Sequence, residues 1–123
     1  MSFGPVTVTE GILTSKDTEL LEFVAHLLLQ NGKLEDSLIL YEALLKLNPG
    51  HSRSLMATCY IYIQLHRPQE ALARLQWLAT NSEESLSEAR VLLHARALVA
   101  LGKTDEARKM LQNPVYEIDA QSW

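Results

Sequence analysis

The stretch TELLEFVAHLLLQNGKLEDSLILYEALLKLNPGH (residues 18–51) aligns without a gap on the stretch that follows it, SRSLMATCYIYIQLHRPQEALARLQWLATNSEES (residues 52–85), at an offset of 34 residues. Small residues fall on small ones and large apolar residues on large ones: Ala25 on Cys59, Ser37 on Ala71, Leu28 on Tyr62, Tyr41 on Leu75, and Leu44 on Leu78. Small side chains let two helices touch closely, and large apolar side chains pack between them. The alignment therefore predicts a repeated pair of antiparallel helices.

A third, less regular unit follows after two extra residues in the preceding loop, with Gly102 in the position of Gly32. The helix boundaries are predicted from glycine and asparagine where helices end and from proline in first turns. Ser85 and Glu88 have the spacing of a capping box for the fifth helix. We expect helices over residues 16–30, 34–47, 52–65, 68–80 and 86–101, and a short sixth helix from 104 to about 112.

These elements predict an all-α chain whose folded domain, residues 16–113, holds three helical hairpins. Residues 1–15 are expected to form an extended N-terminal arm, and residues 114–123 an irregular C-terminal tail. The run YIYI at residues 60–63 has strand propensity. Its neighbouring apolar residues have helical spacing, so we expect a helix there.

The period and the hairpin pattern resemble the tetratricopeptide repeat. This resemblance implies that the hairpins stack in a right-handed superhelix, an α-solenoid, whose first helices line a concave groove for a segment of another protein. The centre of the predicted groove is apolar and its margins are charged, which suits an amphipathic helix or an extended apolar peptide. The predicted groove residues are Glu22, His26, Leu29, Arg53, Met56, Tyr60, Ile63, Leu92, Arg96 and Val99.

Some tetratricopeptide domains grip the free C-terminal carboxylate of a chaperone with Lys and Asn at fixed groove positions. Here Glu22, His26 and Tyr60 stand at those positions. A ligand that ends in a carboxylate is therefore disfavoured.

The last repeat is expected to leave an apolar edge at Met110 and Leu111, because Pro114 stops the sixth helix. Two candidates can shield this edge. The tail can fold back through Val115, Tyr116 and Ile118, or a bound partner can complete the core.

Composition excludes several classes of function. The chain has 123 residues, of which 47% are hydrophobic and 21% charged, and its formal net charge is −4. No basic run points to nucleic acid, and no apolar run reaches the length of a membrane span. The N-terminus lacks a basic region followed by an apolar one, so we expect no secretory signal. With Cys59 as the only cysteine, a reducing, cytoplasmic compartment is expected.

The sequence contains no motif typical of catalysis, metal binding or cofactor binding. The four histidines do not stand at metal-ligand spacing with one another or with Cys59. There is no phosphate-binding glycine loop and no nucleophile elbow. We therefore expect no catalytic residues, no cofactor, no metal and no enzyme activity.

Three stretches carry a closer resemblance: LLLQNGKLEDSLILYEALLKLNPGH, RPQEALARLQWLA with its Trp77, and ALGKTDEARKMLQ. They are similar to the small tetratricopeptide chaperones of bacterial type III secretion, most of all to the YscY (SctY) group. Ser37 departs from that pattern, which has alanine, and the tail after Pro114 has no counterpart in it.

This resemblance implies a non-enzymatic virulence-associated chaperone of the bacterial cytoplasm. It would bind a small early export substrate of the YscX (SctX) type and present it to the export gate ring, in a protein transport role. The pair would be a heterodimer, and the chain alone can self-associate through the same apolar surface. According to the resemblance, the six apolar or aromatic groove residues above make apolar contacts with the partner. Arg53 and Arg96 would bind acidic groups of the partner, and Glu22 would bind its basic groups.

Two alternatives remain open. One is a translocator chaperone of the same secretion systems, and the other is a general tetratricopeptide scaffold or adaptor. The identity of the co-purifying partner separates them.

Overall fold

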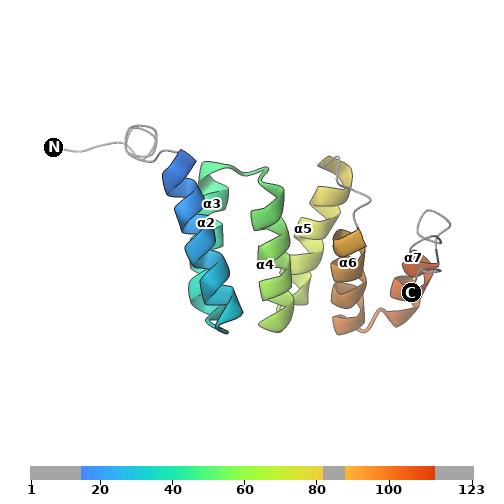
Figure 1. Ribbon diagram of the computed structural model, residues 1–123. Coiled ribbons are helices and arrows are strands. Elements are labelled where there is room, and N and C mark those ends of the chain that lie inside the picture. Colours follow the sequence, from blue (N-terminus) through green and yellow to red (C-terminus); the bar gives the residue numbers. More distant parts are fainter. Residues whose placement is uncertain (1–14, 82–87, 113–123) are drawn as a thin grey trace. The chain divides into compact units, whose positions relative to one another are not determined.

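The fold is taken from a computed structural model, which describes residues 15–81 and 88–112. Within these ranges the chain forms six helices and no strand, as the sequence predicts (Figure 1). The predicted arm before Ser15, the Ser85 capping box and the predicted tail lie outside the described residues. The helices are α2 (Ser15–Gln30), α3 (Leu34–Leu47), α4 (Ser52–Gln64), α5 (Pro68–Asn81), α6 (Glu88–Ala100) and α7 (Thr104–Leu111).

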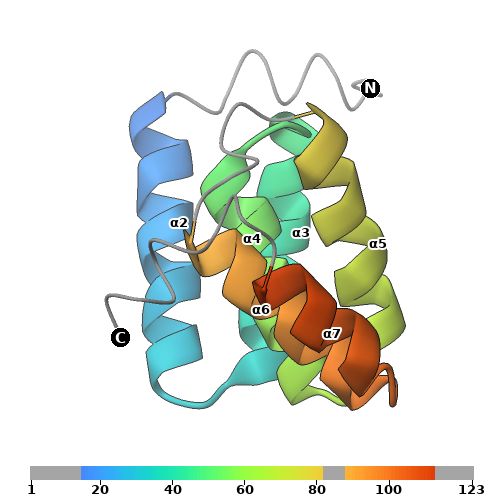
Figure 2. The same ribbon diagram turned by 90° about the vertical axis from the view of Figure 1, so that its right-hand side faces the viewer.

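The chain divides into two compact units, one that ends at Leu55 and one that begins at Met56. The first contains the α2–α3 hairpin and the first turn of α4. The second contains the remainder of α4, then α5 and the α6–α7 hairpin, whose two helices lie side by side (Figure 2). The predicted right-handed superhelix concerns all three hairpins together and stays a prediction.

A pair of small residues lies inside each hairpin, at the positions that the sequence alignment singles out. In the first, the Ser37 hydroxyl on α3 donates a hydrogen bond of 2.7 Å to the Ala25 carbonyl oxygen on α2. In the second, the Cys59 thiol on α4 donates a 3.7 Å bond to the Ala71 carbonyl oxygen on α5. The third pair is Ala95 and Ala107, which share one buried cluster. All six side chains are buried, so the close contact of the two helices is confirmed in each hairpin.

The turn inside each hairpin has a residue in the left-handed region. The backbone φ is 76° at Gly32, 62° at His66 and 80° at Gly102. The following amide, that of Lys33, donates to the Leu28 carbonyl oxygen five residues back, and the other two turns repeat this bond. Such a bond is the mark of a Schellman motif, which satisfies the last carbonyl groups of a helix. The sequence predicts this role for Gly32, but His66 was missed.

The predicted apolar edge of the last hairpin is partly covered by the described chain itself. Met110 and Leu111 on α7 are half-buried and pack against the cluster of Ala95, Leu98 and Ala107. Val115, Tyr116 and Ile118, which are predicted to fold back over this edge, lie outside the described residues. Among the described helices, none is both long enough and apolar enough to cross a bilayer.

Candidate functional site

The ten predicted groove residues lie on the first helix of each hairpin. Four belong to the first unit: Glu22, His26 and Leu29 on α2, and Arg53 on the first turn of α4. Six belong to the second unit: Met56, Tyr60 and Ile63 on α4, and Leu92, Arg96 and Val99 on α6. The residues of the two units are therefore considered as two separate sites.

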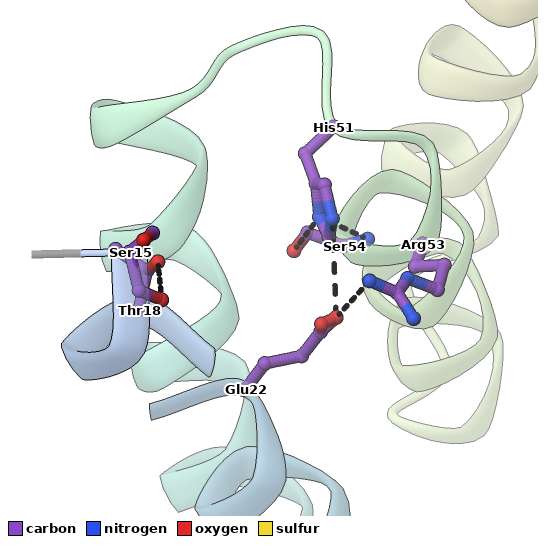
Figure 3. A network of polar contacts seen from close by, with 6 residues as sticks. All are labelled: Ser15, Thr18, Glu22, His51, Arg53 and Ser54. Carbon is purple, nitrogen blue, oxygen red and sulfur yellow. Dashed lines mark hydrogen bonds and ion pairs between the residues drawn. The ribbon is translucent and has the colours of Figure 1, made fainter. Parts of the chain in front are cut away.

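In the first unit the charged groove residues pair with each other. The Arg53 guanidinium Nη2 lies 3.2 Å from Glu22 Oε1, and His51 Nε2 lies 3.8 Å from the same oxygen (Figure 3). Glu22 is mostly covered, whereas the Arg53 side chain is 80% exposed. An ion pair with one partner so exposed adds little stability. Arg53 and Glu22 contact each other. A partner whose charged groups bind these two residues, as the resemblance implies, would have to break this ion pair.

His51 holds this arrangement by capping α4. Its Nδ1 accepts the backbone N–H of Ser54 at 3.3 Å and lies 2.8 Å from the Ser54 hydroxyl (Figure 3). Because Nδ1 is an acceptor, the neutral ring carries its proton on Nε2, the nitrogen that faces Glu22. The cap thus fixes which side of the ring meets the carboxylate. Sequence reasoning missed this role of His51.

A small pocket of about 180 Å³ opens beside this network. Its polar wall includes Thr18, whose hydroxyl donates to the Ser15 carbonyl oxygen at 2.8 Å (Figure 3). Burial, helped by the negative charge of Glu22, raises the pKa of the nearby Tyr41 hydroxyl. The remaining lining residues are Glu19, Glu22, Leu44, Leu47, Asn48, His51 and Arg53. The other two groove residues of this unit, His26 and Leu29, do not line it; His26 is exposed and Leu29 half-buried.

In the second unit, groove residues on α4 and α6 are brought together. Arg96 Nη2 donates to Gln64 Oε1 at 3.3 Å, and Gln64 Nε2 donates to the Tyr60 hydroxyl oxygen at 3.1 Å. The Arg96 guanidinium also lies 5.7 Å from the centre of the Tyr60 ring, within the range of a cation–π contact. Arg96 and Tyr60 therefore lie in one continuous patch, joined through Gln64. Met56 and Ile63, on the same helix as Tyr60, are half-buried.

Next to Arg96, the α6–α7 hairpin carries an open apolar hollow of about 550 Å³. Leu92 and Val99, both predicted groove residues, line it and are 38% and 52% exposed. Arg96 is the charged residue of its lining. The other lining residues are Ala89, Leu93, Ala95, Ala107 and Leu111. An exposed apolar surface with one cation at its rim is typical of a docking site for an apolar helical segment.

A second exposed apolar surface was missed by sequence reasoning. Leu20, Phe23, Val24 and Leu27 on α2 are 60%, 58%, 37% and 39% exposed. The spacing i, i+3, i+4, i+7 places them on one face of the helix, away from buried Ala25. The same spacing can be read from the sequence. It marks a second apolar stripe on a helix whose packing face, the one with Ala25, the repeat alignment had already assigned.

The remaining residues of chemical interest are packed. Burial raises the pKa of the Cys59 thiol to about 12, so it is not a nucleophile at neutral pH. Burial, with the nearby Arg90 charge, lowers the pKa of His94. In residues 15–81 and 88–112, no three His, Cys, Asp or Glu side chains gather as a metal site. The expected lack of a metal, a cofactor and enzyme activity stays a prediction.

Comparison with known proteins supports the repeat assignment. The family model of anaphase-promoting complex, cyclosome, subunit 3 matches residues 30–114, which include most of the three hairpins. No curated protein matches the chain. The chain is thus a tetratricopeptide-type protein, and it belongs to the family of anaphase-promoting complex, cyclosome, subunit 3.

Proposed function

We propose that the chain is a non-enzymatic binding protein that holds an apolar helical segment of a partner against the first helices of its hairpins. The observation that carries the proposal is the apolar hollow on α6 and α7. It is lined by Leu92, Arg96 and Val99, three residues that the repeat register selects without knowledge of the structure. Tetratricopeptide repeats in general bind other proteins.

The bound segment is expected to be apolar along one face and to carry an acidic side chain between its apolar positions. Leu92 and Val99 stand one helical repeat of seven residues apart, so they match apolar side chains spaced over two turns of a partner helix. Arg96 between them offers its positive charge to an acidic group. Its bond to Gln64 is exposed, so exchange for a partner carboxylate costs little.

The more specific form of the proposal is a cytoplasmic chaperone of a bacterial type III secretion system, of the YscY (SctY) kind. It would bind a small early export substrate similar to YscX (SctX) and present it to the export gate. The support is the similarity of the three sequence stretches quoted above and the exposed apolar surface. Such a surface would shield an aggregation-prone segment until export.

The test is co-expression with a YscX-like substrate followed by affinity purification. Val99→Asp should reduce the amount of co-purified substrate at least tenfold, because a charge in the hollow must be desolvated by the apolar segment. Ile39→Asp is the matched control, since Ile39 is 65% exposed on α3 and outside the predicted groove. Circular dichroism checks that both variants keep their helices. Equal recovery with Val99→Asp and the wild type contradicts the assignment of the hollow.

A scaffold or adaptor role is the second candidate, favoured by the family match. The family is named for a subunit of a multiprotein complex, and a scaffold of this kind would join two or more partners. Mass spectrometry of the proteins that co-purify from the native cells separates the candidates. A small secreted substrate supports the chaperone, a pore-forming translocator supports the translocator-chaperone alternative, and several subunits of one assembly support the scaffold.

A further inference from the structure

The apolar hollow on α6 and α7 reaches the point where the chain leaves the last helix. Leu111, the last residue of α7, lines the hollow. The two helices are joined by residues 101–103, and helices joined by so short a turn run antiparallel. Ala107 lies in one buried cluster with Ala95. Leu111, one turn further along α7, is therefore level with the Leu92 end of the hollow, and the chain leaves α7 at that end.

The residues that follow α7 in the sequence match the chemistry of the hollow. The lining is apolar apart from Arg96. The sequence VYEID, residues 115–119, places the acidic Glu117 between the aliphatic residues Val115 and Ile118. An acidic side chain between apolar positions is the pattern that the proposed function expects of a bound segment. The chain thus carries such a segment itself, directly beside the hollow.

The spacing of the two sets of residues also agrees. Val99 lies ~10 Å along α6 from Leu92, because each helical residue advances the chain by ~1.5 Å. In polyproline II backbone, which proline favours, residues three apart share a face and lie ~9 Å apart. Val115 and Ile118 are three residues apart and follow Pro114 directly. In this conformation they would reach the two ends of the hollow together.

We propose that residues 114–119 of the chain itself occupy the hollow and compete there with the partner segment. The proposed contacts join, in chain order, Val115 with Leu92, Glu117 with Arg96, and Ile118 with Val99. The competition rests on the proposed function, because it assumes that the partner binds the same hollow. The contact between the segment and the hollow does not rest on it.

Attachment beside the hollow makes a weakly binding segment effective. A short tether gives an effective concentration in the ~1 mM range. A segment that would bind with a dissociation constant of ~0.1 mM when free then fills the hollow about nine-tenths of the time. A partner that binds only the empty hollow has its dissociation constant raised about tenfold. The contact therefore acts as autoinhibition, and it covers an apolar surface until a partner displaces the segment.

Disulfide trapping in the full chain tests the contact without a partner. Val99→Cys combined with Ile118→Cys should form an intramolecular disulfide on mild oxidation of dilute protein, detected by non-reducing electrophoresis and mass spectrometry. Lys109→Cys combined with Ile118→Cys is the matched control. Lys109 is exposed on the same hairpin, does not line the hollow and is closer to position 118 along the chain. The native Cys59 is fully buried and does not compete.

The relative rates of the two linkages decide the outcome. A docked segment should link position 118 to position 99 at least tenfold faster than to position 109. An undocked segment would link to position 109 at least as fast, because the loop that closes is shorter, and this result overturns the inference. Disulfides that join position 99 to position 118 of a second chain also overturn it. Glu117→Lys should slow the linkage to position 99 about threefold, since it replaces an exposed ion pair with two like charges.

Two probes test the competition: a labelled peptide of residues 113–121, and the substrate co-expressed in the test of the proposed function. Both should bind the full-length Ile118→Asp protein about tenfold more tightly than the wild type, because an aspartate does not stay in the apolar hollow. Val99→Asp should abolish the binding of both. A gain for the peptide alone upholds the contact but contradicts the competition and the proposed function. Substrate binding that Val99→Asp removes and Ile118→Asp leaves unchanged upholds the proposed function and overturns the autoinhibition.

Discussion

At the scale of single residues, the turn between α4 and α5 carries backbone strain. His66 has a φ of 62°, where Gly32 and Gly102 stand in the other two hairpins. A residue with a Cβ atom pays for this conformation, and glycine does not. The hydrogen bond that this turn allows, from the Arg67 amide to the Tyr62 carbonyl oxygen at 2.8 Å, offsets the backbone strain at His66.

Replacement of His66 by glycine should therefore stabilise the protein. We expect His66→Gly to raise the free energy of unfolding by about 1 kcal/mol, measured by urea denaturation. Gly32→Ala is the matched opposite change, because a Cβ atom there meets nothing within 4 Å and only the backbone is strained. It should lower the free energy by about 1 kcal/mol. A destabilised His66→Gly protein would show that the imidazole itself holds the turn.

The buried thiol of Cys59 gives a prediction about pH. Its pKa is raised by burial from 9.0 to about 12 in the folded protein, so the unfolded chain releases the proton first as the pH rises. The thiol's contribution to stability is therefore complete below pH 9 and is lost as the pH rises towards 12. From pH 8 to pH 10 the free energy of unfolding should fall by about 1 kcal/mol through this group.

Cys59→Ala is the control, since alanine fits a position that holds alanine in the other hairpins. Urea denaturation at pH 8, 9 and 10 should show a smaller loss in the variant than in the wild type. Parallel losses in the two proteins would mean that the thiol ionises without penalty in the folded state.

At the scale of helices, local sequence signals are sufficient to find the elements. The predicted helices 34–47, 52–65 and 68–80 agree with α3, α4 and α5 to within one residue at each end. Asparagine, glycine and proline mark the ends of these helices, and the regular spacing of apolar residues identifies the segment between them as a helix. The strand propensity of residues 60–63 did not prevail, because Ile61 and Tyr62 are buried by helix packing.

The small pair inside each hairpin should be the most sensitive point of an element. Ala71 is fully buried where α5 meets α4. Ala71→Leu should lower the free energy of unfolding by about 2 to 3 kcal/mol, because the two helices must move apart. Ala73→Leu, at an exposed position of the same helix, should change it by less than about 0.5 kcal/mol. Thermal unfolding followed by circular dichroism measures both, and equal effects would contradict close packing at Ala71.

The alignment of the repeats does not predict the other parts of the candidate site. The register shows which residues share a face, so it selected Leu92, Arg96 and Val99, which line one hollow in the structure. It does not show which charges meet across a loop, so the pairing of Glu22 with Arg53 and the His51 cap were missed. It also gives the same position number to exposed Leu20 and buried Ser54. What covers a face depends on the neighbouring element, which a helical pattern alone does not contain.

At the scale of the whole molecule, we propose a protein that binds a segment of a partner. The proposed place for that segment is the hollow on α6 and α7.

We expect a partner to bind the face of α6 that carries Leu92 and Val99. Site-specific photo-cross-linking tests it most directly, with a benzophenone side chain in place of Val99 in one protein and in place of exposed Ile39 in another. With a co-expressed YscX-like substrate, or with the main co-purifying protein, position 99 should cross-link to the partner and position 39 should not. Cross-links from position 39 and none from position 99 would contradict the claim.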